Sequence, residues 1–216
     1  MIKRTRPVEV ILWDWNGTLL DDVEVCMASM NTMLSRRGMP VLSLDHYREV
    51  CTFPVINYYR KSGGDIEKES WDALAMEFIG LYMQKLPSAP LHDEAFAVLE
   101  YLARREYRQV MISAMEHNAL SDSVAQKGIR HFFERIEGLS DHYAFSKADI
   151  ALRAIHDMNV SPASACLIGD TLHDLEVADH IACDCLLVAD GHQSRNRLDA
   201  VHDRVISDLK EVRKFF

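Results

Sequence analysis

The sequence is short of positive charge. Its 216 residues include 24 lysines and arginines against 33 aspartates and glutamates, which gives a formal net charge of −9. A protein that binds DNA or RNA needs a basic face for the phosphate backbone, so this balance argues against nucleic acid as the main partner. It does not exclude a small phosphorylated metabolite, because such a ligand needs only a local positive pocket.

A long apolar run is also missing. The basic opening MIKRTRPVEV leads into an apolar run that ends at Asp14. This run is too short for the core of a signal peptide or for a membrane span. We therefore expect no membrane association and a cytoplasmic location. The sequence gives no indication of an oligomeric state.

The sequence lacks the cysteine and histidine spacings that are typical of zinc sites. Its five cysteines are scattered, and the Cys183-Asp-Cys185 pair has no further cysteine or histidine at zinc-finger distance. The ten histidines include no HExxH motif. We interpret the cysteines as buried thiols and most histidines as surface or core residues. Internal repeats and low-complexity tracts are absent as well.

What the sequence does contain is a series of short apolar runs, each followed by a helical pattern. These β-branched-rich runs are Val8–Trp13, Gln109–Ser113, Ala165–Ile168 and Cys185–Val188. Runs that are apolar throughout suit strands covered on both faces. Together with 48% apolar and 26% charged residues, they predict a globular α/β fold with a doubly wound parallel sheet and alternating helices.

Residues 22–89 interrupt this alternation. Apolar residues recur at helical spacing over 23–34 and again over 71–82, and no strand pair is indicated between them. We predict that 22–89 form an all-helical domain inserted after the first strand. Residues 1–21 and 90–216 then form the α/β core.

Polar side chains of different kinds follow the predicted strands. Asp14 ends the first and Ser113 the second, Asp170 and Asp174 follow the third, and Lys147 begins a helical pattern between them. Ligands of a doubly wound sheet bind at the carboxyl ends of its strands. Taken singly, each residue is well explained as a helix cap or a solvated side chain. Together they predict a phosphoryl site, in which one carboxylate attacks phosphorus, two hold Mg²⁺, and the lysine and hydroxyl bind phosphate oxygens.

In this order, the motifs resemble those of the haloacid dehalogenase superfamily, in the branch of phosphoglycolate-phosphatase-like hydrolases with a helical cap. The family's Asp-x-Asp-x-Thr motif is similar to DWNGT, and its Gly-Asp-x-x-x-Asp motif is similar to GDTLHD. Its strand-ending Ser or Thr matches Ser113, and its lysine matches Lys147. The resemblance spans the whole chain, since the predicted insertion falls where the family has its cap, and it implies a Rossmann-like core.

The resemblance also implies a role for each matched residue. Asp14 is the expected nucleophile, which forms an aspartyl-phosphate, and Thr18 is expected to orient its loop. The groups expected to hold Mg²⁺, the implied cofactor, are Asp14, the backbone carbonyl of Asn16, Asp170 and, through water or Lys147, Asp174. The groups expected to hold the phosphate are Ser113, the backbone N–H of Ala114, and Lys147.

Asn16 departs from the family pattern, which has a second aspartate there as general acid/base. An amide can neither protonate a leaving alcohol nor activate water, and losing such a group typically slows a reaction by about 10²–10⁴-fold. Three explanations stay open. The protein is a slow phosphatase for leaving groups that need no proton, or Asp21 or Asp22 substitutes, or the protein binds a phosphorylated ligand without turnover. We favour helix caps before Val23 as the explanation of the two aspartates.

Two other family activities fit less well. Dehalogenases need no metal, whereas the GDTLHD motif keeps the carboxylates that bind one. A phosphonatase needs a cap lysine that forms a Schiff base. Lys61 and Lys68 are available for this role, although solvated cap lysines are far commoner. Substrate choice is expected to lie in the cap, where Arg60 or Lys61 either meets a substrate anion or ends a solvated helix. The resulting prediction is a Mg²⁺-dependent hydrolase of small-molecule phosphate monoesters. Its alternative is a non-catalytic or nearly inactive phospho-ligand-binding protein of the same fold.

Overall fold

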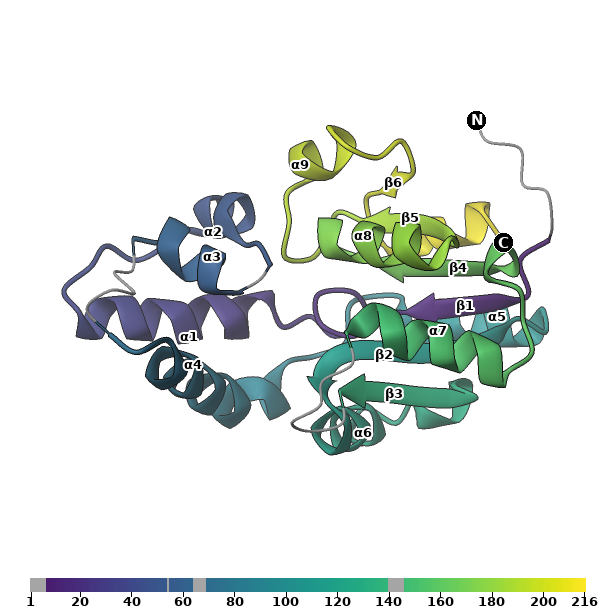
Figure 1. Ribbon diagram of the computed structural model, residues 1–216, viewed down its shortest axis with the longest axis horizontal. Helices are drawn as coiled ribbons and strands as arrows, with labels where there is room; N and C mark the ends of the chain where they lie inside the picture. The colour runs from purple at the N-terminus through teal and green to yellow at the C-terminus, as the bar shows by residue number, and fades with distance from the viewer. Residues whose placement is uncertain (1–6, 54, 64–68, 140–145) are drawn as a thin grey trace.

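The computed structural model describes residues 7–53, 55–63, 69–139 and 146–216. Within these ranges its centre is a six-stranded sheet in which every neighbouring pair is parallel, in the order β3-β2-β1-β4-β5-β6 (Figure 1). The strands are β1 (Val10–Trp13), β2 (Arg108–Glu116), β3 (Arg135–Leu139), β4 (Ala165–Gly169), β5 (Asp184–Val188) and β6 (Val205–Ile206). All four side chains of the central strand β1 are completely buried, as expected for a strand covered on both faces.

Helices cover both faces of the sheet, because successive strand residues point to opposite sides. On one face, Ile11 and Trp13 pack with α5 (Ala95–Arg104), α6 (His117–Gln126) and the 3₁₀ helix η4 (Leu209–Lys214). On the other face, Val10 and Leu12 pack with α7 (Lys147–Asp157), α8 (Leu172–Ile181) and α9 (Arg195–Asp199). Short 3₁₀ turns complete the core: η2 (Arg130–Phe132) and η3 (Pro162–Ser164). The predicted fold class, an α/β doubly wound parallel sheet, is confirmed.

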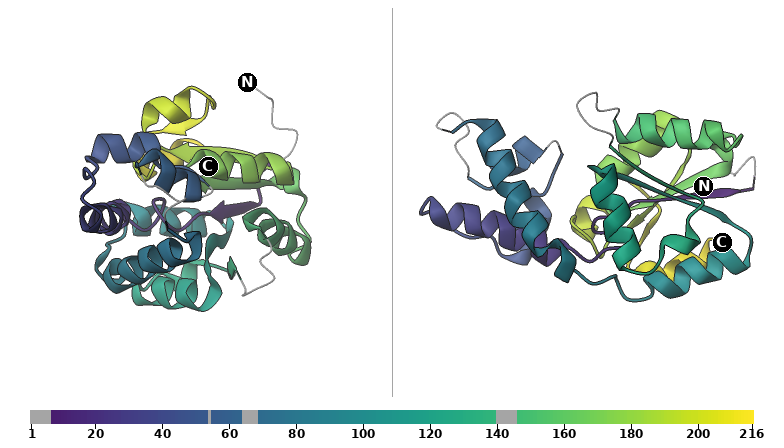
Figure 2. Two further views of the ribbon diagram at one scale, coloured as in Figure 1. Left: turned by 60° about the vertical axis from the view of Figure 1, so that its left-hand side comes forward. Right: turned by 90° about the horizontal axis from the view of Figure 1, so that it is seen from below.

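In the described part of residues 23–85, four helices form a group of their own beside the sheet (Figures 1 and 2). They are α1 (Val23–Arg36), α2 (Leu44–Val50), α3 (Val55–Lys61) and α4 (Trp71–Lys85), followed by the 3₁₀ turn η1 (Leu86–Ser88). Their packing centres on a separate hydrophobic cluster that includes Met30, Met33, Tyr59 and Leu74. The described part of this segment contains no strand. We call these four helices the cap and the remainder the core.

The chain passes between core and cap twice, and the two crossings run side by side. Leu20 forms an antiparallel bridge with Leu91, and the Asp21 N–H donates to the Pro90 carbonyl at 2.9 Å. This pairing supports our proposal that the core comprises residues 1–21 and 90–216 and the cap residues 22–89, because the insertion leaves and re-enters the core at one place.

Other sequence-based expectations have a direct structural counterpart. None of the five cysteines is in a disulfide, and each is buried or half-buried, which agrees with their interpretation as ordinary thiols. Among the helices that the structure describes, none is long and apolar enough to cross a membrane. Strands β3 and β6, the two outermost strands of the sheet, are not predicted by the sequence pattern.

Candidate active site

The central strands end at the edge of the sheet that faces the cap, and the predicted carboxylates meet there. β1 leads into Asp14, whose N–H donates to the Ile168 carbonyl of β4 at 2.9 Å. β4 leads into Asp170, and Asp174 lies in the first turn of α8. Because β1 and β4 are neighbours, ligand oxygens of Asp14, Asp170 and Asp174 lie within 4.8 Å of one another. We call this group the carboxylate cluster.

Lys147 joins two members of this cluster. A capping box fixes the first turn of α7, where Lys147 is the first residue. Its ammonium donates to Asp14 Oδ1 and, at 2.6 Å, to Asp174 Oδ1. The other oxygen of Asp174 accepts hydrogen bonds from the N–H and hydroxyl of Thr171, in the capping box that starts α8. Asp174 is therefore committed to α8 and to Lys147, whereas Asp14 keeps one oxygen away from the lysine.

The carboxylate cluster holds more negative charge than Lys147 neutralises. Burial raises the pKa of Asp14 to about 8 and the pKa of Asp170 to about 6, and neighbouring carboxylates add to both shifts. Burial also acts to raise the pKa of Asp174, but Lys147 outweighs it and the pKa falls below its ordinary value. Hard oxygen ligands with uncompensated charge are what a divalent cation such as Mg²⁺ prefers. The residues present therefore fit this ion.

The loop after Asp14 passes close to Asp170, and Gly17 makes this possible. Gly17 has φ +72°, and a Cβ atom there would collide with the side chains of Asp170 and His192. Thr18, completely buried behind this turn, donates to Asp170 Oδ1 at 3.1 Å and, more weakly, to Asp14 Oδ2 at 3.4 Å. Thr18 thus orients the two carboxylates, and its expected role in orienting the loop stays a prediction.

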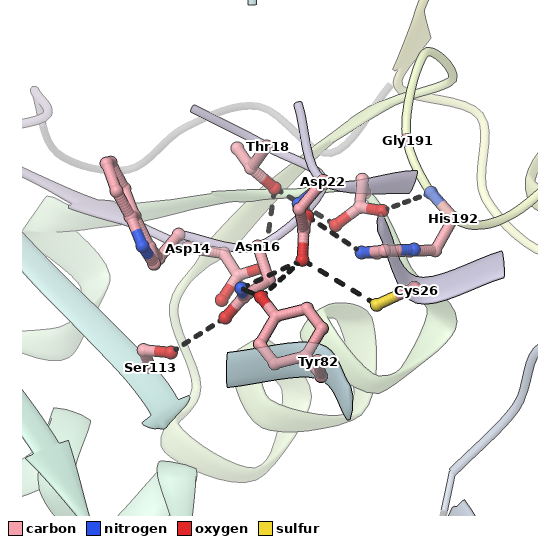
Figure 3. Close-up of polar contacts among 12 residues, drawn as sticks. Asp14, Asn16, Thr18, Asp22, Cys26, Tyr82, Ser113, Gly191 and His192 are labelled. Atoms are coloured by element: carbon pink, nitrogen blue, oxygen red, sulfur yellow. Dashed lines mark hydrogen bonds and ion pairs between the residues drawn. The ribbon is translucent and has the colours of Figure 1, made fainter. Parts of the chain in front are cut away.

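The Asn16 amide faces a second polar group (Figure 3). Its Nδ2 donates to Asp22 Oδ2 at 3.0 Å and to the Tyr82 hydroxyl at 2.7 Å. Its Oδ1 lies 3.4 Å from the Ser113 hydroxyl, which donates to it. The Tyr82 hydroxyl in turn donates to Asp22 Oδ2 at 2.6 Å. Both ends of the amide are therefore occupied by neighbouring side chains.

Asp22 corrects an expectation from the sequence. It occupies the N-cap position of α1, but its side chain makes no capping hydrogen bond to that helix. The completely buried carboxylate turns back toward the loop, where Oδ1 accepts from the Gly17 N–H at 2.7 Å and pairs with His192 Nε2 at 3.3 Å. Hydrogen-bond donors from the loop and from His192 converge on this carboxylate. Together they bind it more strongly than the N–H groups in the first turn of α1 would. Asp21, its neighbour, is half-buried at the crossing and does not line the cavity described below.

His192 completes this second group, and the sequence reasoning did not find it. Its Nδ1 lies 2.7 Å from the Tyr47 hydroxyl of α2, and its backbone N–H donates to Asp170 Oδ2 at 2.6 Å. Burial acts to lower the pKa of His192, but the Asp22 carboxylate outweighs it and raises the pKa to about 9. Burial acts to raise the pKa of Asp22, but the His192 charge outweighs it and lowers this pKa. The two residues form an ionic pair, which we call the Asp22–His192 pair.

A cavity of about 570 Å³ lies over these groups, between core and cap. Seven of the eight predicted site residues line it; Thr18 does not. The seven are Asp14, Asn16, Ser113, Ala114, Lys147, Asp170 and Asp174. Arg60 and Lys61, the possible contacts for a substrate anion, are exposed and are not part of the lining. Lys68, the other candidate Schiff-base lysine, falls outside the described residues.

The sequence and structure of the chain match those of known proteins over most of its length. The model of the haloacid dehalogenase-like hydrolase family matches residues 11–188. The chain belongs to this family. A phosphoglycolate phosphatase of Pseudomonas putida is 24% identical over 212 residues, which cover 94% of this chain and 78% of the relative. An N-acetylmuramic acid 6-phosphate phosphatase of the same organism is 29% identical over 185 residues, covering 78% of this chain and 77% of the relative.

Solved structures of haloacid dehalogenase-like proteins share the architecture. A hydrolase of this family from Streptococcus pneumoniae superposes with a TM-score of 0.80 and 23% identity, covering 97% of this chain and 98% of that chain. At that identity the likeness shows the fold alone. The predicted membership, and with it a phosphatase-type hydrolase, is confirmed. The roles of individual residues in this haloacid dehalogenase-like hydrolase stay predictions.

Proposed function

We propose that this hydrolase cleaves small-molecule phosphate monoesters with Asp14 as nucleophile and Mg²⁺ as cofactor. The observation that carries the proposal is the convergence of the carboxylate cluster and one buried lysine on the floor of a single cavity. A phosphate that enters this cavity meets Lys147 on one side and the end of β2, with Ser113 and the exposed Ala114, on the other. The named phosphatase relatives agree with a small phosphorylated metabolite as substrate, and a cytoplasmic location is part of the proposal.

Asp14 takes part in both steps, as the nucleophile in the first and as the leaving group in the second. Its carboxylate attacks phosphorus while the bond from phosphorus to the ester oxygen breaks, and the electron pair leaves with that oxygen. Water then attacks the phospho-Asp14, which restores the carboxylate and releases inorganic phosphate. Lys147 acts to lower the pKa of Asp14, against the effect of burial, and offsets the charge of the phosphate, while Asp174 keeps the lysine in place.

The metal ligands we propose are Asp14, Asp170 and the backbone carbonyl of Asn16, with Asp174 acting through Lys147. When bound, Mg²⁺ offsets the repulsion between the carboxylates and the incoming phosphate and polarises the phosphate oxygens. Thr18 and the His192 N–H hold the two oxygens of Asp170, so this ligand keeps its orientation before any ion arrives.

One observation favours a second function, ligand binding without turnover. The Asn16 amide stands where the family has its acid/base, and both of its ends are engaged with other side chains. A steady-state assay decides between the two functions. We expect phosphate release from 4-nitrophenyl phosphate in the presence of Mg²⁺ and its loss in excess chelator. Saturable binding of inorganic phosphate with no release from 4-nitrophenyl phosphate, sugar phosphates or phosphoglycolate supports the binding protein instead.

A further inference from the structure

We propose that the substrates are aryl phosphates, in which a phenolic oxygen carries the phosphate and the rest of the leaving group is apolar. This inference rests on the phosphatase function proposed above and names its substrate class. Two independent features of the cavity lead to it: the proton donors around Asn16 are all engaged, and the wall opposite the phosphate site is apolar and carries no positive charge.

The first feature concerns the departure of the leaving group. Around Asn16, the Tyr82 hydroxyl donates to Asp22, and the His192 ring has Asp22 at Nε2 and Tyr47 at Nδ1. Within this network no side chain offers an unengaged proton to a leaving oxygen; Tyr58 and His173, which line the cavity with a hydroxyl and an Nδ1 that make no hydrogen bond to the described residues, lie outside it. An alcohol is nearly as weak an acid as water, whose pKa is about 15.7. An alkoxide therefore leaves poorly unless a donor supplies it with a proton. A phenolate, whose conjugate acid has a pKa of about 10, leaves without protonation.

The second feature is the wall that the cap contributes. Phe78 and Tyr82 of α4 stack with ring centroids 6.0 Å apart and planes within 11°. Ile79 and Met83, on the same helix, line the cavity and remain 49% and 40% exposed. Phe53, 41% exposed, lines the cavity as well. An apolar ring above the phosphate covers these surfaces and gains the hydrophobic contact that they offer.

The wall also lacks a partner for a second anion. Among the described residues that line the cavity, the only lysine or arginine is Lys147, which already faces the phosphate site, and the charge of His192 is already paired with Asp22. Arg48 of α2 does not line the cavity and donates to the carbonyls of Gly191 and Asp190. A carboxylate or second phosphate on the substrate would lose its hydration here without gaining a counter-charge. This disfavours phosphoglycolate and bisphosphates.

The reaction balances without a further reagent. Asp14 forms a bond to phosphorus as the aryl oxygen–phosphorus bond breaks, and the electron pair leaves as phenolate. Water then supplies a hydroxyl group to the released hydrogen phosphate, and its other proton passes by way of the solvent to the phenolate. The products are a phenol and inorganic phosphate.

A matched pair of substrates tests the first feature. Phenyl phosphate and benzyl phosphate both carry an aromatic ring, but only benzyl phosphate has an alkoxide leaving group. At saturating Mg²⁺ we expect kcat/KM for phenyl phosphate to exceed that for benzyl phosphate by about 100-fold or more. The ratio is taken in kcat/KM because hydrolysis of phospho-Asp14 is common to both substrates. Equal values overturn the inference and leave the phosphatase function standing.

A pair of variants on α4 tests the second feature. Ile79→Lys places a cation on the cavity wall, whereas Met76→Lys places one on the same helix at a residue that is 68% exposed and does not line the cavity. We expect Ile79→Lys to raise KM for 2-naphthyl phosphate, because the apolar ring loses its apolar contact. We expect it to lower KM for phosphoglycolate, because the carboxylate of this substrate gains a counter-charge. Each change should be about fivefold or more. Met76→Lys should change neither constant.

Two outcomes contradict this part of the inference. If Ile79→Lys and Met76→Lys behave alike, the cap wall does not contact the substrate and the inference fails. The same holds if the parent prefers phosphoglycolate over 2-naphthyl phosphate. If no phosphate ester of the panel is turned over at saturating Mg²⁺, the proposed function fails together with the inference, which distinguishes this result from the others.

Discussion

Two buried ionic groups lie side by side in this hydrolase, and they are built differently. The carboxylate cluster combines three carboxylates with one lysine, and the pKa values of Asp14 and Asp170 are raised by burial. The Asp22–His192 pair balances one carboxylate with one imidazolium, and its carboxylate also accepts hydrogen bonds from Gly17, Asn16 and Tyr82. The carboxylate cluster keeps negative charge that a bound cation can neutralise. In the Asp22–His192 pair, by contrast, the charges are balanced and the carboxylate oxygens are already hydrogen-bonded, so we call this pair saturated. We infer that the saturated pair is the support and the strained cluster is the working site.

Contacts between the two groups show how the support acts. The His192 N–H holds Asp170 Oδ2, and Asp22 holds the Gly17 N–H at the turn that brings Thr18 to Asp170. The pair also reaches into the cap, through Tyr47 of α2 and Tyr82 of α4. It therefore fixes the loop that carries Asp14, the proposed nucleophile, and ties that loop to the helices over the cavity.

The sharpest test of this comparison is to remove the charge of Asp14, the proposed nucleophile. Asp14→Asn is nearly isosteric, so we expect phosphatase activity to fall by at least about 10³-fold while the thermal unfolding temperature stays the same or rises. Steady-state kinetics and circular dichroism on the same preparation measure both effects. Turnover at the parent's rate means that another residue attacks phosphorus.

Stability separates the two groups next. Asp22→Ala leaves the buried His192 charge unpaired, and we expect a loss of about 3–5 kcal/mol in the free energy of unfolding. Asp170→Ala, measured without Mg²⁺, removes one of several crowded carboxylates and should cost no more than about 1 kcal/mol, or stabilise the chain. Urea unfolding of both variants provides the comparison. Equal losses contradict the division into support and working site.

Metal affinity then sharpens the comparison. Asp170→Ala should weaken Mg²⁺ binding by at least about 10–100-fold, since even partners outside the ligand shell have effects of this size. Asp179→Ala, an exposed aspartate on α8, is the matched control and should bind Mg²⁺ like the parent. Isothermal calorimetry gives both constants. If Asp170→Ala binds as tightly as the control, Asp170 is not a ligand.

The smallest expected effect lies where the two groups meet. Asn16→Asp supplies the family's acid/base but points a carboxylate at Asp22, whose oxygen lies 3.0 Å from the present amide nitrogen. We expect this variant alone to gain less than about threefold on benzyl phosphate, whereas Asn16→Asp with Asp22→Asn restores a carboxylate–amide pair and gains about tenfold or more. Equal kcat/KM values for the single and double variants would show that Asp22 does not limit the activity of a carboxylate at position 16 as an acid/base.

The fold was predictable where the sequence pattern is local. β1, β2, β4 and β5 are recognised as apolar runs because both of their faces are covered. β3 is a half-buried edge strand whose sequence RIEGL alternates and includes Glu137 and a glycine, and β6 has two residues. Neither leaves an apolar run, so periodicity alone misses them.

The candidate site was predictable from the strand ends, with one omission. Asp14, Ser113, Asp170 and Lys147 come together as the order of the strands requires. The same argument applied to the end of β5 points to His192. The pairing of His192 with Asp22 could not be found in this way, because the helix start next to Asp22 offers a local explanation and His192 is 170 residues away along the chain.

The paired crossings at Leu20 and Leu91 bear on how such an enzyme acquires new substrates. Because the cap leaves and returns through adjacent, hydrogen-bonded segments, its two ends sit together on the core. A helical insertion of another length or composition can be seated at the same junction without altering a single strand register. The cap, which is expected to select the substrate, can therefore change by mutation while the residues at the strand ends, which are expected to carry the chemistry, stay the same.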